Sequence, residues 1–148
     1  MRLVIQRCLN GNVAIDGKTV GAIDHGFVVL VGVCNEDDKT IVDKMVIKLI
    51  KLRICEDADG KTNLSIQDTN GSILLISQFT LYADCKKGNR PSFVNAGSPD
   101  HANALYEYMI EAIRNAGIPC EHGEFGADMK VSLVNDGPFT IVLDSEML

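Results

Sequence analysis

The chain has 148 residues, 46% hydrophobic and 23% charged, with a formal net charge of −6 at pH 7. This length and composition are typical of one globular domain with its own core, here residues 1–148, and argue against disorder. The negative charge argues against a protein that coats nucleic acid non-specifically, because such binding depends on neutralising phosphates. It leaves open an enzyme that contacts a nucleic acid locally, since local and global charge are separate properties.

The first third of the chain predicts strands. Residues 2–9 alternate polar and apolar side chains, as a half-buried strand does. Asn10-Gly11 and Asp16-Gly17 are turn signals, with a short strand expected at 13–15 between them. Residues 27–33 form a continuous, β-branched apolar run that predicts a strand covered on both faces. The first residues lack the apolar block of a signal peptide and no run reaches membrane-spanning length, so we expect a cytoplasmic protein.

Two segments have helical periodicity. In residues 37–52, Ile41, Met45 and Leu49 recur every four positions, and lysines occupy the opposite face. The second helix opens at Ser98-Pro99, with Ser as N-cap and Pro at the first helical position, and ends before Gly117. Both segments are predicted to be amphipathic helices.

The remaining segments complete an α+β pattern. Residues 73–82 are strand-like, and residues 84–97 have the glycine, proline and polar content of a loop. Residues 130–134 and 139–143 predict two last strands on either side of Asn135-Asp136-Gly137-Pro138. The pattern predicts a single α+β domain with mostly antiparallel strands and two main helices.

Cysteines and histidines do not form a metal-binding pattern. The five cysteines are an odd number and contain no CxxC pair, so reduced thiols are expected. His25, His101 and His122 are scattered without HxxxH or HExxH spacing. The sequence therefore indicates no metal site and no cofactor.

Three polar segments are candidates for a functional site. In a strand, Ser77, Phe79 and Leu81 would face one way and Gln78, Thr80 and Tyr82 the other. Ser77-Gln78 ends an apolar run, where strand ends often present polar groups to a ligand, although Thr80 alone is an ordinary strand residue. Asn135–Pro138 alone is an ordinary turn. The third candidate is the loop 84–97. Its basic residues either remain solvated or contact phosphates: Lys86, Lys87 and Arg90.

These segments carry a resemblance to a known family. The stretches SQFTLYADCKKGNRPSF (77–93) and FGADMKVSLVNDGPFT (125–140), with the opening MRLVIQR, are similar to those of the D-aminoacyl-tRNA deacylases. The likeness spans nearly the whole chain, including the lengths between motifs. Two positions depart from many relatives: Cys85 stands where they carry Thr, and Asn89 where they carry a basic residue. The second departure bears on the strength of the basic loop.

The resemblance implies a fold and a set of site residues. It implies a homodimer whose barrel-like sheet is flanked by helices, with the active site at the dimer interface. Gly137-Pro138 would be a cis pair that enters the partner's pocket, where its carbonyls would hold the α-amino group of a D-amino acid. Ser77, Gln78, Phe79 and Thr80 would line the pocket around the ester. Phe125 and Met129 match family positions near the terminal adenosine of tRNA.

The resemblance also implies a reaction, the hydrolysis of the ester in D-aminoacyl-tRNA. Thr80 has no His or Lys beside it in the motif, which favours a positioning role over that of a nucleophile. The 2′-hydroxyl of the terminal ribose is then a candidate for activating water, with backbone N–H groups near Gln78 and Phe79 holding the oxyanion. A Gly-Pro wall that rejects L side chains cannot reject glycine, so glycyl-tRNA mischarged on tRNA for alanine is an expected substrate.

Three other functions remain open at this point. The same pocket would serve a tRNA-end binding module without turnover. In an interaction or structural dimer, the Gly-Pro segment would only pack at the interface between the chains. A Thr- or Cys-dependent esterase for small substrates would use Thr80 or Cys85, although Cys85 has no evident His partner.

Overall fold

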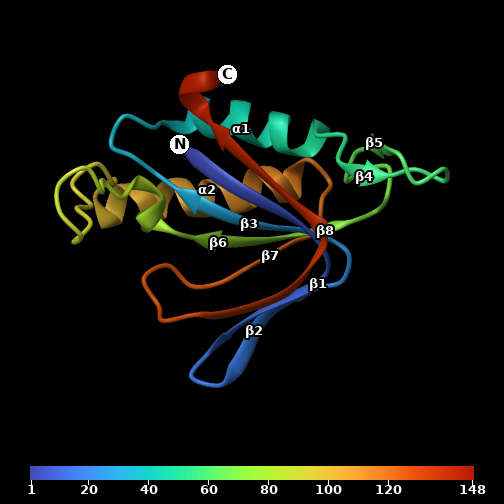
Figure 1. Ribbon diagram of the computed structural model, residues 1–148, viewed down its shortest axis with the longest axis horizontal. Helices are drawn as coiled ribbons and strands as arrows, with labels where there is room; N and C mark the ends of the chain where they lie inside the picture. Colours follow the sequence, from blue (N-terminus) through green and yellow to red (C-terminus); the bar gives the residue numbers. More distant parts are fainter.

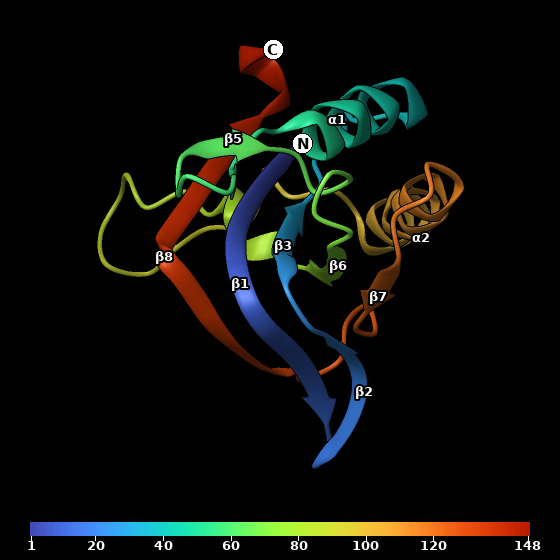
Figure 2. The ribbon, with the colours of Figure 1, turned by 90° about the vertical axis from the view of Figure 1, so that its right-hand side faces the viewer.

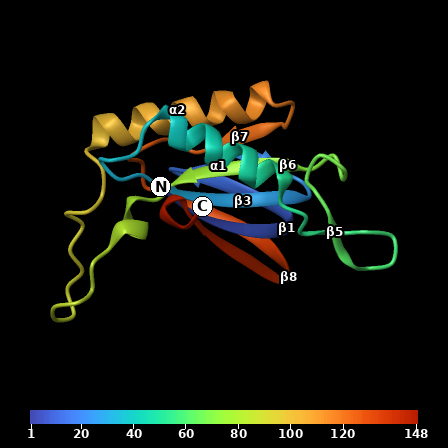
Figure 3. The ribbon, with the colours of Figure 1, turned by 90° about the horizontal axis from the view of Figure 1, so that it is seen from above.

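The computed structural model describes residues 1–148 and consists of a curved mixed β-sheet with two helices on one face (Figures 1 and 3). The helices are α1 (Lys39–Lys51) and α2 (Pro99–Asn115), which lie side by side. The main sheet has the order β2-β1-β3-β6-β7, and a sixth strand, β8, lies off this path and pairs with β1. Its strands are β1 (Arg2–Ile15), β2 (Lys18–Ile23), β3 (Gly26–Gly32), β6 (Ser72–Ser77), β7 (Cys120–His122) and β8 (Lys130–Asp144). A small hairpin, β4 (Cys55–Glu56) and β5 (Thr62–Leu64), and two 3-10 turns, η1 (Phe79–Tyr82) and η2 (Ser145–Met147), complete the chain.

The fold is α+β, as predicted, and antiparallel strand pairs are in the majority. β1 pairs antiparallel with β2, β3 and β8, whereas β3–β6 and β6–β7 are parallel. Parallel neighbours need a crossover connection. The segments containing α1 and α2 supply these two crossovers, and for this reason both helices lie against the sheet.

Strand β1 is longer than the sequence pattern predicts. The turn expected at Asn10-Gly11 is wrong, because β1 runs without a break from Arg2 to Ile15 and the hairpin turn comes at Asp16-Gly17. At Gly11 the strand bends close to β3, where a Cβ would lie 2.8 Å from Cγ2 of Val28. Glycine therefore permits a close approach here instead of ending the strand.

The curved sheet encloses two apolar clusters. The larger one lies between the sheet and the helices and includes Phe27, Leu49 and Met109, all fully buried. The smaller one lies on the other face, where β8 curls back along β1 (Figure 2). It includes Val13, Val28 and Leu74. Closure of the sheet around this second cluster produces the barrel-like shape.

Strand β8 also differs from the prediction of two strands around a turn. It pairs with β1 along its length, from Lys130 opposite Ala14 to Asp144 opposite Arg2. Between the pairs Asn135–Cys8 and Thr140–Gln6, residues 136–139 of β8 stand opposite a single residue, Arg7. The segment is thus an enlarged bulge within one strand. None of the helices in residues 1–148 is long and apolar enough to cross a membrane.

Candidate functional site

The first candidate segment lies where β6 ends and the chain turns back onto β3. The strand predicted over 73–82 ends at Ser77, and η1 follows it. The Gln78 N–H donates to the carbonyl of Val31 (2.7 Å), and the Leu81 N–H donates to the carbonyl of Gln78 (3.2 Å). The turn fits closely because β3 ends in Gly32, where a Cβ would lie 2.8 Å from the Cβ of Leu81.

This turn changes which side chains are accessible. The predicted alternation would place Thr80 and Tyr82 on one face, but Thr80 is exposed and Tyr82 is buried. The amide of Gln78 donates to Oγ1 of Thr80 at 2.5 Å. The ring of Phe79, 53% exposed, packs edge-on against Phe93 with ring centroids 5.1 Å apart. The end of β6 therefore presents an amide, a hydroxyl and an aromatic pair to solvent.

The second candidate segment is the bulge of β8. The side chain of Asn135 spans it: Oδ1 accepts the Phe139 N–H (2.8 Å) and Nδ2 donates to the Phe139 carbonyl (3.2 Å). Gly137 has a φ of 140°, which favours glycine, and the bond between Gly137 and Pro138 is cis. Both residues are exposed.

Arg7 supports this bulge from inside the sheet and was not singled out from the sequence. Its guanidinium, almost completely buried, donates to the carbonyls of Asp136 (3.0 Å) and Ile54 (2.8 Å) and lies 4.6 Å from the ring centroid of Phe139. The sequence does contain a signal for it. Arg7 has the same parity in the strand as the buried Leu3 and Ile5, so its side chain points inward.

The two candidate segments lie far apart within one chain. The turn η1 packs on Gly32, which is opposite Arg2, whereas Gly137 belongs to the bulge opposite Arg7. Five residues along β1 separate these levels, about 17 Å at the rise of an antiparallel strand. A single chain therefore does not bring Gly137-Pro138 to Thr80.

The other expected site residues occupy two loops. Phe125 and Met129 lie in the connection between β7 and β8, where Phe125 is 6.3 Å from the ring of Tyr106 and Met129 packs beside Gly123. The segment 84–97 is a loop, as predicted, and its three basic side chains are exposed and form no ion pair: Lys86, Lys87 and Arg90.

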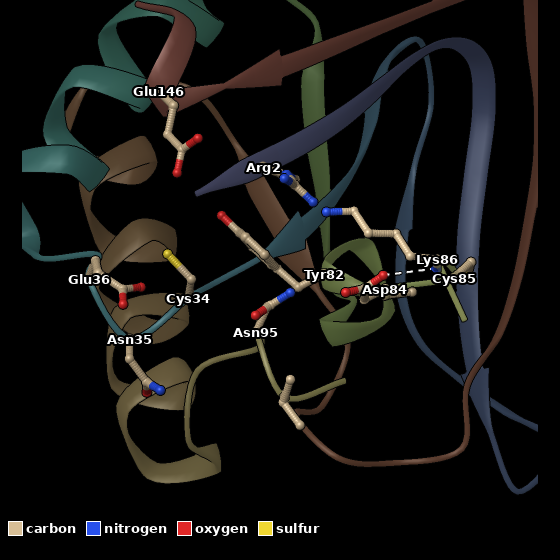
Figure 4. A pocket seen from close by; sticks show the side chains of 12 residues that line it. Arg2, Cys34, Asn35, Glu36, Tyr82, Asp84, Cys85, Lys86, Asn95 and Glu146 are labelled. Atoms are coloured by element: carbon tan, nitrogen blue, oxygen red, sulfur yellow. Dashed lines mark hydrogen bonds between the residues drawn. The ribbon is translucent and has the colours of Figure 1, made fainter. Parts of the chain in front are cut away.

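A polar cavity of about 690 Å³ lies beside η1 (Figure 4). Arg2, Cys34 and Tyr82 are among its lining residues, and Lys86 reaches it from the basic loop. Burial raises the pKa of the Tyr82 hydroxyl and that of the Cys34 thiol, so both groups are neutral at physiological pH. None of the residues from Ser77 to Thr80 lines this cavity. No group of three or more His, Cys, Asp or Glu side chains gathers closely enough in residues 1–148 to hold a metal ion.

Comparison with known proteins identifies the family. Residues 4–144 match the family described as D-Tyr-tRNA(Tyr) deacylase. A D-aminoacyl-tRNA deacylase of Lactobacillus acidophilus is 58% identical over 144 residues, which are 97% of this chain and 99% of the relative. A D-aminoacyl-tRNA deacylase of Thermosipho africanus is 52% identical over 146 residues, 99% of this chain and 98% of the relative.

Solved structures agree with the sequence relatives. A protein described as c-Myc DNA Unwinding Element Binding Protein has a TM-score of 0.92 and 38% identity, covering 97% of this chain and 98% of its own. A probable eukaryotic D-amino acid tRNA deacylase has a TM-score of 0.83 over 96% of this chain and 97% of its own; at 19% identity it shows the fold alone. The resemblance seen in the sequence is confirmed: the chain belongs to the D-Tyr-tRNA(Tyr) deacylase family, a family of hydrolases.

Proposed function

We propose that this enzyme hydrolyses the ester of D-aminoacyl-tRNA, and of glycyl-tRNA mischarged on tRNA for alanine, while sparing L-aminoacyl-tRNA. One observation carries the proposal beyond the names of the relatives. Phe79 and Thr80 of η1 are exposed, and so are Gly137 and Pro138 of the β8 bulge, yet the two segments lie about 17 Å apart along β1. A pocket that uses both segments must therefore be built from two chains.

The second chain is a copy of the first. Strand β8 is hydrogen-bonded to β1 on one side only, and its exposed side chains include Val134 and Val142, 47% and 67% accessible. An exposed apolar edge strand of this length favours association. In the proposed homodimer, Gly137 and Pro138 of one protomer enter the pocket formed by Ser77–Thr80 of its partner.

The chemistry of the pocket favours water activated by the substrate. The hydroxyl of Thr80 is hydrogen-bonded to the Gln78 amide and to no histidine, lysine or carboxylate. A hydroxyl without a base is a poor nucleophile. The 2′-hydroxyl of the terminal ribose assists the attacking water in this proposal. Of the two N–H groups expected to hold the oxyanion, that of Gln78 is already donated to Val31, which leaves the N–H of Phe79 for this role.

The other contacts of the substrate follow from the exposed loops. Phe125 and Met129 are proposed to contact the terminal adenosine, and Lys86, Lys87 and Arg90 to contact phosphates near the acceptor end. The three basic side chains form no internal ion pair and are free to bind an anion. Because these contacts would neutralise phosphates, we expect the binding of tRNA to weaken as the salt concentration rises.

Handedness would arise from exclusion at the Gly-Pro segment. The pyrrolidine ring of the partner's Pro138 and the carbonyls beside it would occupy the space that an L side chain needs. Glycine has no side chain to exclude, so the same wall admits it.

Hydrolysis of D-tyrosyl-, L-tyrosyl- and glycyl-tRNA by the purified protein, with and without EDTA, tests the proposal. We expect rapid loss of the D and glycyl esters, persistence of the L ester and no effect of EDTA. Resistance of glycyl-tRNA would refute the steric account. Binding of tRNA without loss of any ester would instead identify a non-catalytic tRNA-end binding module.

A further inference from the structure

Arg2 makes three contacts, two with η1 and one with β8. Its Nη1 donates to the carbonyl of Leu81 at 3.0 Å, and its Cζ lies 4.5 Å from the centroid of the Tyr82 ring. Its Nε donates to Oδ2 of Asp144 at 2.9 Å. Figure 4 shows the guanidinium beside the Tyr82 ring at the wall of the polar cavity. One side chain therefore contacts both the end of the turn and the end of β8.

The two ends of η1 are held by different means. At its start, the Gln78 N–H is bonded to Val31, and the turn rests on Gly32 of β3. At its end, the Leu81 carbonyl accepts a hydrogen bond from the side chain of Arg2. Phe79 and Thr80 lie between these two attachments and are exposed.

The carboxylate that orients Arg2 is charged at neutral pH. Burial acts to raise the pKa of Asp144, but hydrogen bonds from the Glu146 N–H and from Arg2 outweigh it and lower this pKa overall. Asp144 and the bulge at Gly137 belong to the same strand. The Arg2–Asp144 pair thus joins the turn that carries Thr80 to the strand that carries Gly137 and Pro138.

We propose that Arg2 is a positioning residue for the reaction, which holds η1 in place by fastening Leu81 and Tyr82 to Asp144 of β8. The inference rests on the proposed function and adds a residue outside the motifs that line the pocket. Arg2 touches no reacting atom in this role. An arginine is needed because its planar fork can donate to a carboxylate and to a carbonyl at once while stacking on a ring, which the single nitrogen of a lysine cannot reproduce.

The test compares Arg2→Met with Arg114→Met. Arg114 is a matched control because it also binds a carbonyl, that of Cys120 (2.8 Å), and a carboxylate, that of Glu111 (3.3 Å), but does so at the end of α2. Steady-state hydrolysis of D-tyrosyl-tRNA gives kcat and KM for both variants. Hydrogen exchange of the peptide spanning residues 78–84, followed by mass spectrometry, reports the order of η1 without depending on activity.

We expect Arg2→Met to lower kcat by about 10²-fold with KM within about threefold of the parent, because a small displacement of positioned groups acts mainly on the chemical step. Exchange in residues 78–84 should become faster in this variant alone. Arg2→Lys, which keeps the pair with Asp144, should recover part of kcat. Arg114→Met should leave kcat and the exchange of this peptide unchanged.

Two results would overturn the proposal. A loss of kcat no greater than in Arg114→Met would show that Arg2 has only a structural role, and a loss confined to KM would show that Arg2 contacts the tRNA directly. If Arg2→Met does not fold, Asp144→Asn weakens the same attachment and should produce a smaller fall in kcat with faster exchange in residues 78–84; normal kcat and exchange would contradict the proposal. An inactive parent protein would count against the proposed function, and the exchange measurement would then still show whether Arg2 holds η1 in place.

Discussion

At the scale of single residues, the hydroxyl of Thr80 has one hydrogen-bond partner, the amide of Gln78. This arrangement predicts that Thr80→Ala lowers kcat for D-tyrosyl-tRNA by no more than about tenfold, because only a positioning contact is lost. Thr80→Ser, which keeps the hydroxyl, should retain nearly all activity. A fall of about 10⁴-fold in Thr80→Ala with intact tRNA binding would return Thr80 to the role of nucleophile.

The cysteines differ in accessibility, and this difference yields a second prediction. Cys8, Cys34, Cys55 and Cys120 are buried, and burial raises the pKa of each thiol, that of Cys120 to about 12. Because the thiolate is the reactive form, these four stay protonated and unreactive at neutral pH. Cys85 is exposed. A thiol-blocking reagent should modify Cys85 alone in the folded protein.

Mass spectrometry of the labelled protein measures this directly, and unfolding in urea should expose all five thiols. Deacylation should survive the labelling of Cys85 and the substitution Cys85→Ser. Loss of activity on both treatments would revive the Cys-dependent esterase.

Single residues also show where sequence reasoning stops. The positions of Gln78 and Thr80 follow from the motif, but their surroundings depend on Gly32 and Val31 of another strand. The alternation of Phe79, Thr80 and the residues after them was wrong because these non-local contacts turn the chain. Parity within β1 could have placed Arg7 inward, although Arg7 was not singled out from the sequence. It could not reveal that Arg7 binds the carbonyls of Asp136 and Ile54.

At the scale of elements, the two helices begin in different ways. The side chain of Asp38 accepts the Ile41 N–H at 2.9 Å and so caps α1. Ser98 occupies the predicted N-cap of α2, but its side chain makes no capping bond; its N–H instead donates to Oδ1 of Asn35. Asp38→Ala should therefore destabilise the protein by about 1 kcal/mol. Ser98→Ala should cost less than about 0.5 kcal/mol.

Urea unfolding at one fixed protein concentration compares these two variants, since association would shift the apparent stability. Equal losses in both variants would mean that Asp38 contributes nothing through its capping bond. The comparison tests a detail that periodicity alone does not supply. The helical segments were predicted within two residues of their observed starts because apolar spacing and cap residues are local signals.

At the scale of the whole molecule, the arrangement of the strands is what the sequence could not predict. The parallel pairs β3–β6 and β6–β7 arise because two helical crossovers return the chain to the same sheet edge. In the bulge of β8, four residues stand opposite Arg7, and no local pattern encodes this register. These long-range features separate η1 from Gly137 and make a second chain necessary for the proposed pocket.

A pocket shared between two chains predicts that two defective chains can restore each other. One variant would carry an altered pocket, Phe79→Pro, which removes the N–H proposed to hold the oxyanion, and the other an altered bulge, Gly137→Ala with Pro138→Ala. Each alone should be inactive, since both of its pockets contain a defect. When equal amounts are unfolded and refolded together, half of the dimers should be mixed, and each mixed dimer contains one intact pocket. Activity should then return to about one quarter of the parent level, because the two chains of a two-fold dimer exchange equivalent surfaces.

Recovery should be absent if the two variants are mixed without unfolding and the dimers do not exchange chains. Size-exclusion chromatography with light scattering measures the dimer at twice the chain mass of 16.1 kDa. Mixed dimers that form but remain inactive would show that each pocket is complete within its own chain, and the role proposed for Gly137 and Pro138 would have to be abandoned.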